Sequence, residues 1–199
     1  MTAVFLDRDG VINENSLQDY VKDWNEFVFL PGAKEALKRL AEQTAVKIFI
    51  VSNQAGIGKG VVSAERVEEI NRQMRREIEA AGGRVDAIFC CPHTVQDRCS
   101  CRKPEPGLLL RALGETTRDA YKLFVVGDAL SDIAAGRKMA ATTIMVKTGR
   151  GEAQLRLLSA QRLQPDHIVE DVSEAVEIIL QAVRRKQTEE RACVAGNRS

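Results

Sequence analysis

The sequence predicts an α/β fold with a doubly wound, Rossmann-like parallel sheet, and two observations carry this prediction. Short apolar segments rich in β-branched residues recur along the 199 residues, and stretches with apolar residues at helical spacing separate them. The apolar segments contain few polar residues, as is typical of parallel strands covered on both faces. Because the alternation shows no internal repeat, we expect one domain over residues 1–188 and a flexible polar tail over residues 189–199.

The N-terminal half should contribute three strands and two helices. The expected strands are residues 3–6, 46–51 and 85–89. The first helix opens at Pro31 and Gly32, and the second begins after Ser63 as its N-cap and stops at Gly82. Two loops leave strand ends, a polar one over residues 13–25 and a flexible, glycine-rich one over residues 54–60.

The C-terminal half continues the same pattern. The expected strands are residues 121–126, 142–146 and 167–169. Helices are expected over residues 106–113, through Ala135 and Met139, near Leu155 and around Val176. Strand and helix therefore alternate to the end of the domain, which is the order of a parallel sheet.

Composition limits the partners of the protein. Apolar residues make up 44% and charged residues 29% of the chain, as in soluble globular proteins, and the net charge is +1. So small a charge does not attract nucleic acid or an anionic membrane. No apolar run reaches the length of a membrane span, and the N-terminus has no signal-peptide pattern. We expect a cytoplasmic monomer that acts on a small molecule.

Two carboxylates close the first strand. Asp7 and Asp9 follow its apolar residues and are separated by one position, and Gly10 then lets the backbone turn. Two like charges this close are costly unless a cation lies between them or one of them holds a proton. A simple Asp-rich turn would account for Asp9 and Gly10 alone, so the pair indicates a functional site.

Polar side chains also end two later strands. Ser52 follows the second expected strand, and Asp128 follows the fourth. Since the carboxyl ends of parallel strands meet at one edge of a sheet, these groups should converge on Asp7 and Asp9. Asp7 and Asp128, with a backbone carbonyl near Asp9, would form the all-oxygen site that Mg²⁺ prefers.

A phosphoryl group bound beside such a metal needs donors and a cation on its other oxygens. Ser52 can supply a hydroxyl. We expect the cation to be Lys103, because Pro104 restricts the backbone next to it.

A cysteine cluster follows the third expected strand. Four of the five cysteines fall between residues 90 and 101, which in a reducing compartment indicates metal rather than disulfides. The four ligands of the softness that tetrahedral zinc requires are Cys91, His93, Cys99 and Cys101. They leave no open position, so zinc in the loop over residues 90–104 should be structural. Cys90 is the weaker candidate because it can end the strand, and reactive or incidental thiols are the alternative.

Together these motifs resemble the haloacid dehalogenase superfamily. The four motifs of that family are matched by residues 7–13, by Ser52-Asn53-Gln54, by Cys91-Pro92-His93 with residues 99–104, and by Gly127-Asp128 with Asp132. The set is most similar to the zinc-containing branch of histidinol phosphatases and heptose-bisphosphate phosphatases. The resemblance covers residues 3–150 and implies the superfamily fold, without a large cap domain, and phosphatase activity.

The resemblance also implies roles for single residues. The nucleophile of the family falls on Asp7 and its acid/base on Asp9. Asp7 would attack phosphorus, while Asp9 would protonate the leaving oxygen and then activate water. The phosphate-binding hydroxyl falls on Ser52, the lysine on Lys103, and the Mg²⁺ site on Asp128 together with Asp7 and Asp9.

The position of Asp132 allows two interpretations. It is expected to hold Lys103 or a metal-bound water. The alternative is an acid that only stabilises the start of its helix.

The substrate is expected to be a phosphorylated sugar or alcohol. Too little chain separates the motifs to form a cap domain, so the polar loop and the zinc loop should wall an open site. The residues expected to bind substrate are Tyr20, Asn53, Gln54 and Arg102, of which Arg102 would hold the sugar or a second phosphate bidentately. Residues 54–60 and 102–107 are more similar to the heptose-bisphosphate phosphatases and favour heptose 1,7-bisphosphate as the substrate. The short gap from His93 to Cys99 is equally similar to the histidinol-phosphate enzymes. Ala129 stands where the heptose branch often has a basic residue, which argues against the bisphosphate.

Two non-enzymatic classes fit the sequence less well. A receiver domain also gathers acids around Mg²⁺, but it lacks an acid/base two residues after its phosphorylated aspartate and has no zinc loop. A zinc-bearing nucleic-acid module would need a basic face. Asp9 and the net charge of +1 argue against them.

Overall fold

Six parallel strands form one sheet in the order β3-β2-β1-β4-β5-β6. They are β1 (Thr2–Leu6), β2 (Val46–Asn53), β3 (Ala87–Cys91), β4 (Lys122–Gly127), β5 (Thr142–Val146) and β6 (His167–Val169). The structure, a computed structural model, describes residues 1–15, 19–114, 121–157 and 163–196, so parts of the expected polar loop and tail lie outside it. The expected doubly wound parallel sheet is confirmed.

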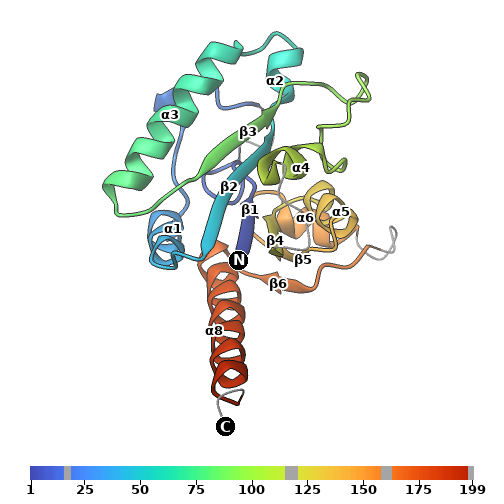
Figure 1. Cartoon of the computed structure of the whole chain (residues 1–199). Coiled ribbons are helices and arrows are strands. Elements are labelled where there is room, and N and C mark those ends of the chain that lie inside the picture. The colour runs from blue at the N-terminus through green and yellow to red at the C-terminus, as the bar shows by residue number, and fades with distance from the viewer. Residues whose placement is uncertain (16–18, 115–120, 158–162, 197–199) are drawn as a thin grey trace.

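Helices cover both faces of the sheet (Figure 1). One face packs against α1 (Ala33–Ala41), α3 (Ala64–Ala80) and α8 (Val172–Gly196), and the other against α4 (Gly107–Leu113), α5 (Leu130–Lys138) and α6 (Gly151–Leu155). Successive strand residues point to opposite faces, so Val4 and Leu6 join the first core while Ala3 and Phe5 join the second.

Local sequence explains how the N-terminal helices begin. The hydroxyl of Ser63 accepts a hydrogen bond from Arg66 N at 3.2 Å and caps α3, as expected. Gly32 precedes α1 with φ at 76°, a conformation that favours glycine. Both helices start where the sequence predicts.

The structure differs from the expected local structure in two places. The glycine-rich segment expected to be a flexible loop begins with a short helix, α2 (Ala55–Gly58), and Gly58 N donates to Pro92 O at 2.9 Å. A Cβ on Gly58 would lie 2.7 Å from that oxygen, so this glycine permits close packing. The third strand starts two residues later than expected, at Ala87, although Val85 is already buried in the core. Among its described residues, the polar loop ends in the 3₁₀ turn η1 (Trp24–Glu26).

The C-terminal segment continues a helix. The backbone of α8 is helical to Gly196, so residues 189–196 extend it, and the flexibility expected there stays a prediction. Among the residues that the structure describes, no helix combines the length and the apolar character that a bilayer span requires.

The strand order places β1 at the switch point of the sheet. This strand pairs with β2 on one side and with β4 on the other, so the winding of the sheet reverses here. Ligands of open α/β sheets bind at the carboxyl ends of the strands at such a switch point. Asp7, Ser52 and Asp128 all lie at that edge.

Candidate active site

A buried lysine lies at the centre of the site. Lys103 Nζ is 3.0 Å from Asp7 Oδ1 and 2.6 Å from Asp132 Oδ1, and it donates to Val51 O at 2.6 Å. Although burial lowers the pKa of Lys103, the charges of Asp132 and Asp7 raise it above its ordinary value. Lys103 is therefore a cation held in one place by the end of β1, by β2 and by α5.

Asp132 performs both of the tasks expected as alternatives. One oxygen pairs with Lys103, and the other accepts from Ala129 N at 3.1 Å at the start of α5. This second bond satisfies a free N–H of the first helical turn and aims the carboxylate at the lysine.

Three buried carboxylates meet beside Lys103. Oxygens of Asp7, Asp128 and Asp132 lie within 4.8 Å of one another. Burial raises the pKa of Asp7 to about 6 despite Lys103, and burial together with Asp7 raises the pKa of Asp128. Asp128 Oδ1 is buried and has no hydrogen-bond partner in the described part of the chain. Lys103 offsets only one of the three charges, so Asp7 and Asp128 fit as ligands of a hard divalent cation.

Two glycines allow loops to approach Asp128 closely. Gly10 has φ at 89° and Gly149 has φ at 60°. A Cβ would lie 2.1 Å from Asp128 Oδ2 if it were added to Gly10, and 2.4 Å from the same oxygen if it were added to Gly149. That oxygen accepts from Arg150 N at 2.8 Å and from Asn15 Nδ2 at 3.2 Å. These bonds fix the carboxylate and leave Oδ1 for a metal.

Asp9 lies in different surroundings from the other acids. Its carboxylate accepts from Arg8 at 2.9 and 3.1 Å, from Asn13 Nδ2 at 3.0 Å and from Gln54 Nε2 at 2.7 Å. Burial raises its pKa, but the charge of Arg8 and these hydrogen bonds outweigh burial and lower the pKa below its ordinary value. Asp9 is not among the clustered carboxylates, so its expected part in the Mg²⁺ site stays a prediction.

The polar residues that end β2 are engaged with other residues of the site. Gln54 Nε2 donates to Ser52 Oγ at 2.8 Å as well as to Asp9, and Ser52 Oγ lies 3.5 Å from the same carboxylate. Asn53 and the backbone of Lys103 exchange two hydrogen bonds of 3.0 Å. Asn53 and Gln54 thus orient Lys103 and Asp9, and their expected contact with substrate stays a prediction.

The four expected zinc ligands come together after β3. Cys101 Sγ lies 3.2 Å from Cys91 Sγ, 3.4 Å from Cys99 Sγ and 3.3 Å from His93 Nδ1. Cys91 Sγ is 3.6 Å from both Cys99 Sγ and His93 Nδ1. Ligands of a tetrahedral zinc are roughly 3.5 to 3.8 Å apart. Two of these distances fall in that range and the three to Cys101 Sγ are a few tenths of an ångström shorter, so the donor types fit zinc and the four side chains need to move apart only slightly to hold it. Cys90 lies outside the cluster.

Known proteins with similar sequences include heptose-1,7-bisphosphate 7-phosphatases. Residues 100–175 match the family described as HAD-hydrolase-like. D-glycero-alpha-D-manno-heptose-1,7-bisphosphate 7-phosphatase of Mycobacterium tuberculosis is 45% identical over 140 residues, which cover 70% of this chain and 73% of that protein. The chain belongs to the haloacid dehalogenase-like phosphatases. The corresponding beta-anomer enzyme of Pseudomonas aeruginosa is 35% identical over 181 residues, covering 90% of this chain and 98% of the relative.

A solved structure agrees with this placement. The D,D-heptose 1,7-bisphosphate phosphatase of B. bronchiseptica, crystallised with magnesium and phosphate, superposes with a TM-score of 0.82 at 34% identity. The alignment covers 92% of this phosphatase and 99% of that chain. The expected family, fold and class of enzyme are confirmed.

Two hollows flank the carboxylates of the phosphatase. One, of about 300 Å³, is lined by Asp9, Gln54 and Lys59, and the other, of about 420 Å³, by Arg98 and Arg102 of the zinc loop. The residues that border both hollows are Tyr20, Asn53 and Arg150. Between β1 and β3 the described residues form only η1, α1, β2, α2 and α3, so no cap domain is inserted there.

Arg102 has two neighbours that bear on its role. It lines the larger hollow, as expected of a substrate-binding residue, but its Nη1 also donates to His93 O at 3.1 Å. This bond braces the guanidinium on the zinc loop. The structure therefore permits both substrate binding and loop support.

Sequence reasoning missed Arg150. Its side chain is 48% exposed, and Nε lies 3.6 Å from Asp128 Oδ2 at the border of both hollows. A basic residue between two glycines soon after β5 was the available signal, because β5 ends at the same edge of the sheet as β1 and β4.

Proposed function

We propose that this phosphatase removes the 7-phosphate of D-glycero-D-manno-heptose 1,7-bisphosphate. The observation that carries the proposal is that relatives at 45% and 35% identity are both named as heptose-1,7-bisphosphate 7-phosphatases, the first for the alpha anomer and the second for the beta anomer. The two hollows support it, since a sugar with two phosphates needs two anion-binding regions. Lys59 lies at one hollow and Arg98 and Arg102 at the other, with Arg150 between them. In this proposal the phosphatase acts in the cytoplasm as a monomer, without nucleic acid or membrane.

The proposed mechanism has two steps. Arg8 keeps Asp9 ionised in the free protein, and the negative charge of the bound phosphate raises the pKa of Asp9 so that its carboxyl takes up a proton. First an oxygen of Asp7 bonds to phosphorus, the bond from phosphorus to the sugar oxygen breaks, and Asp9 passes this proton to that oxygen. Then a water oxygen bonds to phosphorus, Asp9 takes the proton of the water, and Asp7 is released with free phosphate. Lys103 and Ser52 hold phosphoryl oxygens throughout.

Two metals belong to the proposal. Asp7 and Asp128, with the backbone near Asp9, would hold Mg²⁺, in keeping with the magnesium and phosphate bound to the B. bronchiseptica enzyme. When bound there, Mg²⁺ neutralises negative charge on the transferring phosphoryl group. The structural zinc would be held by Cys91, His93, Cys99 and Cys101.

Asp128→Asn is expected to abolish stabilisation by Mg²⁺. At about 100 times its Kd, a ligand adds about 2.7 kcal/mol to the free energy of unfolding, and the variant loses a buried ligand charge. Thermal melts in chelator-free buffer, with and without Mg²⁺, measure the difference. Asp171→Asn, at the start of α8, is the control and should keep the shift. An undiminished shift in Asp128→Asn would place the metal elsewhere.

Arg102→Ala is expected to raise KM far more than it lowers kcat. A guanidinium that binds the part of the substrate that does not react contributes equally to the ground state and the transition state. The loss should be larger for a sugar bisphosphate than for its monophosphate, because the second phosphate would lose a bidentate partner. Steady-state kinetics on both substrates tests this, with the exposed Arg111→Ala on α4 as control. Equal losses of kcat/KM on the two substrates would contradict binding of the second phosphate by Arg102 and would mean that Arg102 only supports the zinc loop.

The proposed substrate is tested by ³¹P NMR of a hydrolysis panel. It contains both anomers of heptose 1,7-bisphosphate and histidinol phosphate. We expect the 7-phosphate signal to disappear while the 1-phosphate signal remains, faster for the α anomer because the 45% identical relative is named for it. A higher kcat/KM for histidinol phosphate would overturn the substrate assignment but keep the phosphatase.

A further inference from the structure

A buried arginine connects Asp9 to the interior of the protein. Arg8 is 1% exposed, although it lies between two aspartates in the sequence. Its Nη2 reaches both oxygens of Asp9, at 2.9 and 3.1 Å, and its Nε lies 3.3 Å from one of them. The remaining arm, Nη1, points the other way and donates to Asn71 Oδ1 at 3.0 Å. A planar guanidinium bonded on two sides has its orientation fixed.

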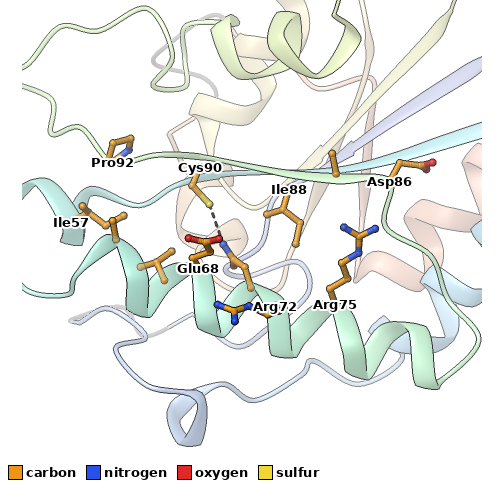
Figure 2. A pocket seen from close by; sticks show the side chains of 12 residues that line it. Ile57, Glu68, Arg72, Arg75, Asp86, Ile88, Cys90 and Pro92 are labelled. Atoms are coloured by element: carbon orange, nitrogen blue, oxygen red, sulfur yellow. Dashed lines mark hydrogen bonds between the residues drawn. The ribbon is translucent and has the colours of Figure 1, made fainter.

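Asn71 is also buried and bonds to a second residue besides Arg8. It is 7% exposed on α3, and its Nδ2 donates to Cys90 Sγ at 3.3 Å on β3 (dashed line in Figure 2). The sulfur acceptor sets the direction of the amide, so that the oxygen faces Arg8.

The surroundings of Asn71 separate it from the substrate. It lines a hollow of about 570 Å³, together with the apolar Ile57, Val67 and Ile88. Figure 2 shows this hollow between α3 and β3, with Ile57 and Ile88 labelled. Neither hollow beside the clustered carboxylates includes Asn71 in its lining. Any effect of Asn71 on the reaction must therefore pass through another residue.

We propose that Asn71 is a positioning residue for Asp9 and acts through Arg8. The inference rests on the acid/base role of Asp9 under the proposed function. Asp9 must reach the leaving oxygen in one step and the attacking water in the next, so its carboxylate needs a defined place. Without an acceptor at position 71, Nη1 of Arg8 is buried and unsatisfied, which costs free energy until the guanidinium moves. Asp9, bound to that guanidinium, moves with it.

The dependence on the leaving group separates this role from a structural one. p-Nitrophenolate leaves without a proton, whereas a sugar alkoxide requires the proton of Asp9. Since kcat/KM reports the steps up to transfer of the phosphoryl group, misplacing Asp9 should lower kcat/KM for the sugar phosphate alone. A general loss of structure would lower both values equally.

The experiment compares kcat/KM for heptose 1,7-bisphosphate, or another alkyl phosphate that the wild type hydrolyses, with that for p-nitrophenyl phosphate. Asn71→Leu should lose roughly 10 to 100-fold on the alkyl substrate and less than about threefold on the aryl one. Asn71→Asp keeps an acceptor for Arg8 and should recover most of the loss, although it buries a charge. Asn71→Ser is too short to reach Arg8 and should show the selective loss if the leucine variant does not fold.

Two further variants make the outcomes decisive. Glu68 lies on α3 and lines the same hollow as Asn71, so Glu68→Gln is the control and should change kcat/KM for neither substrate. Asp9→Asn should show the selective loss at full size. The proposed role of Asn71 is wrong if Asp9→Asn shows the selective loss but Asn71→Leu and Asn71→Ser do not. It is also wrong if the two Asn71 variants lose kcat/KM equally on both substrates. If Asp9→Asn itself loses equally on both, the acid/base role of Asp9 is wrong and the inference falls with it.

Discussion

Asp7→Asn is expected to lower turnover by about 10⁶-fold, as the loss of a covalent nucleophile does in other enzymes. An amide oxygen is a poor nucleophile, so the Asp7→Asn variant would not form the covalent intermediate that the proposed mechanism requires. The fold should survive, because burial already raises the pKa of Asp7 and its ionised form is disfavoured in the metal-free protein. Removing one of three clustered carboxylates therefore relieves repulsion.

Phosphate release at saturating Mg²⁺ measures this effect, and thermal melting confirms the fold. Asp171→Asn is the control. Asp171 is also an aspartate at the start of a helix, but it is not one of the proposed catalytic residues, so this variant should retain full turnover. Turnover near the wild-type rate in a folded Asp7→Asn protein would remove the proposed nucleophile.

Loss of the zinc is expected to cost on the order of 10 kcal/mol of folding free energy, as for other structural zinc sites. That is comparable with the whole stability of many domains, which is about 5 to 15 kcal/mol. Loss of the zinc should also lower activity, because Lys103 follows Cys101 by two residues and pairs with Asp7. Cys99→Ser should therefore lose metal, stability and activity together.

Elemental analysis of protein purified without chelator should find about one zinc per chain, the content of one four-ligand site. Cys90→Ser is the matched control, since Cys90 lies next to Cys91 but outside the cluster, and it should keep the metal. Zinc-free wild-type protein would contradict the assignment. So would a Cys90→Ser variant that loses as much zinc as Cys99→Ser.

The sequence was sufficient for the sheet and for most of the site, for one physical reason. Strands covered on both faces are continuously apolar, so polar residues at their carboxyl ends stand out and must share one edge. Asp7, Ser52 and Asp128 were found in this way. Asn53 and Gln54 stood out by the same rule, but the rule does not show that their side-chain amides also bond to neighbouring residues of the site.

The buried polar connection behind Asp9 was not predicted. An arginine between two aspartates usually lies in solvent, and the partner of Arg8 is 63 residues away along the chain. One signal was present: Asn71 falls on the apolar stripe of α3, four residues after Val67 and three before Met74. A polar residue on a buried stripe requires a buried partner, which only the tertiary structure identifies.

The central claim is that Asp7 carries the phosphoryl group between the two steps. It is tested most directly by acid quench of the Asp9→Asn variant during turnover of p-nitrophenyl phosphate, whose leaving group needs no proton from Asp9, followed by peptide mass spectrometry. This variant lacks the base that activates water, so the intermediate should accumulate. We expect the peptide containing Asp7 to gain the mass of one phosphoryl group, and to gain none when Asp7 is also replaced by Asn. Phosphate release from the variant with no phosphorylated peptide, or with the added mass on another residue, would contradict the claim.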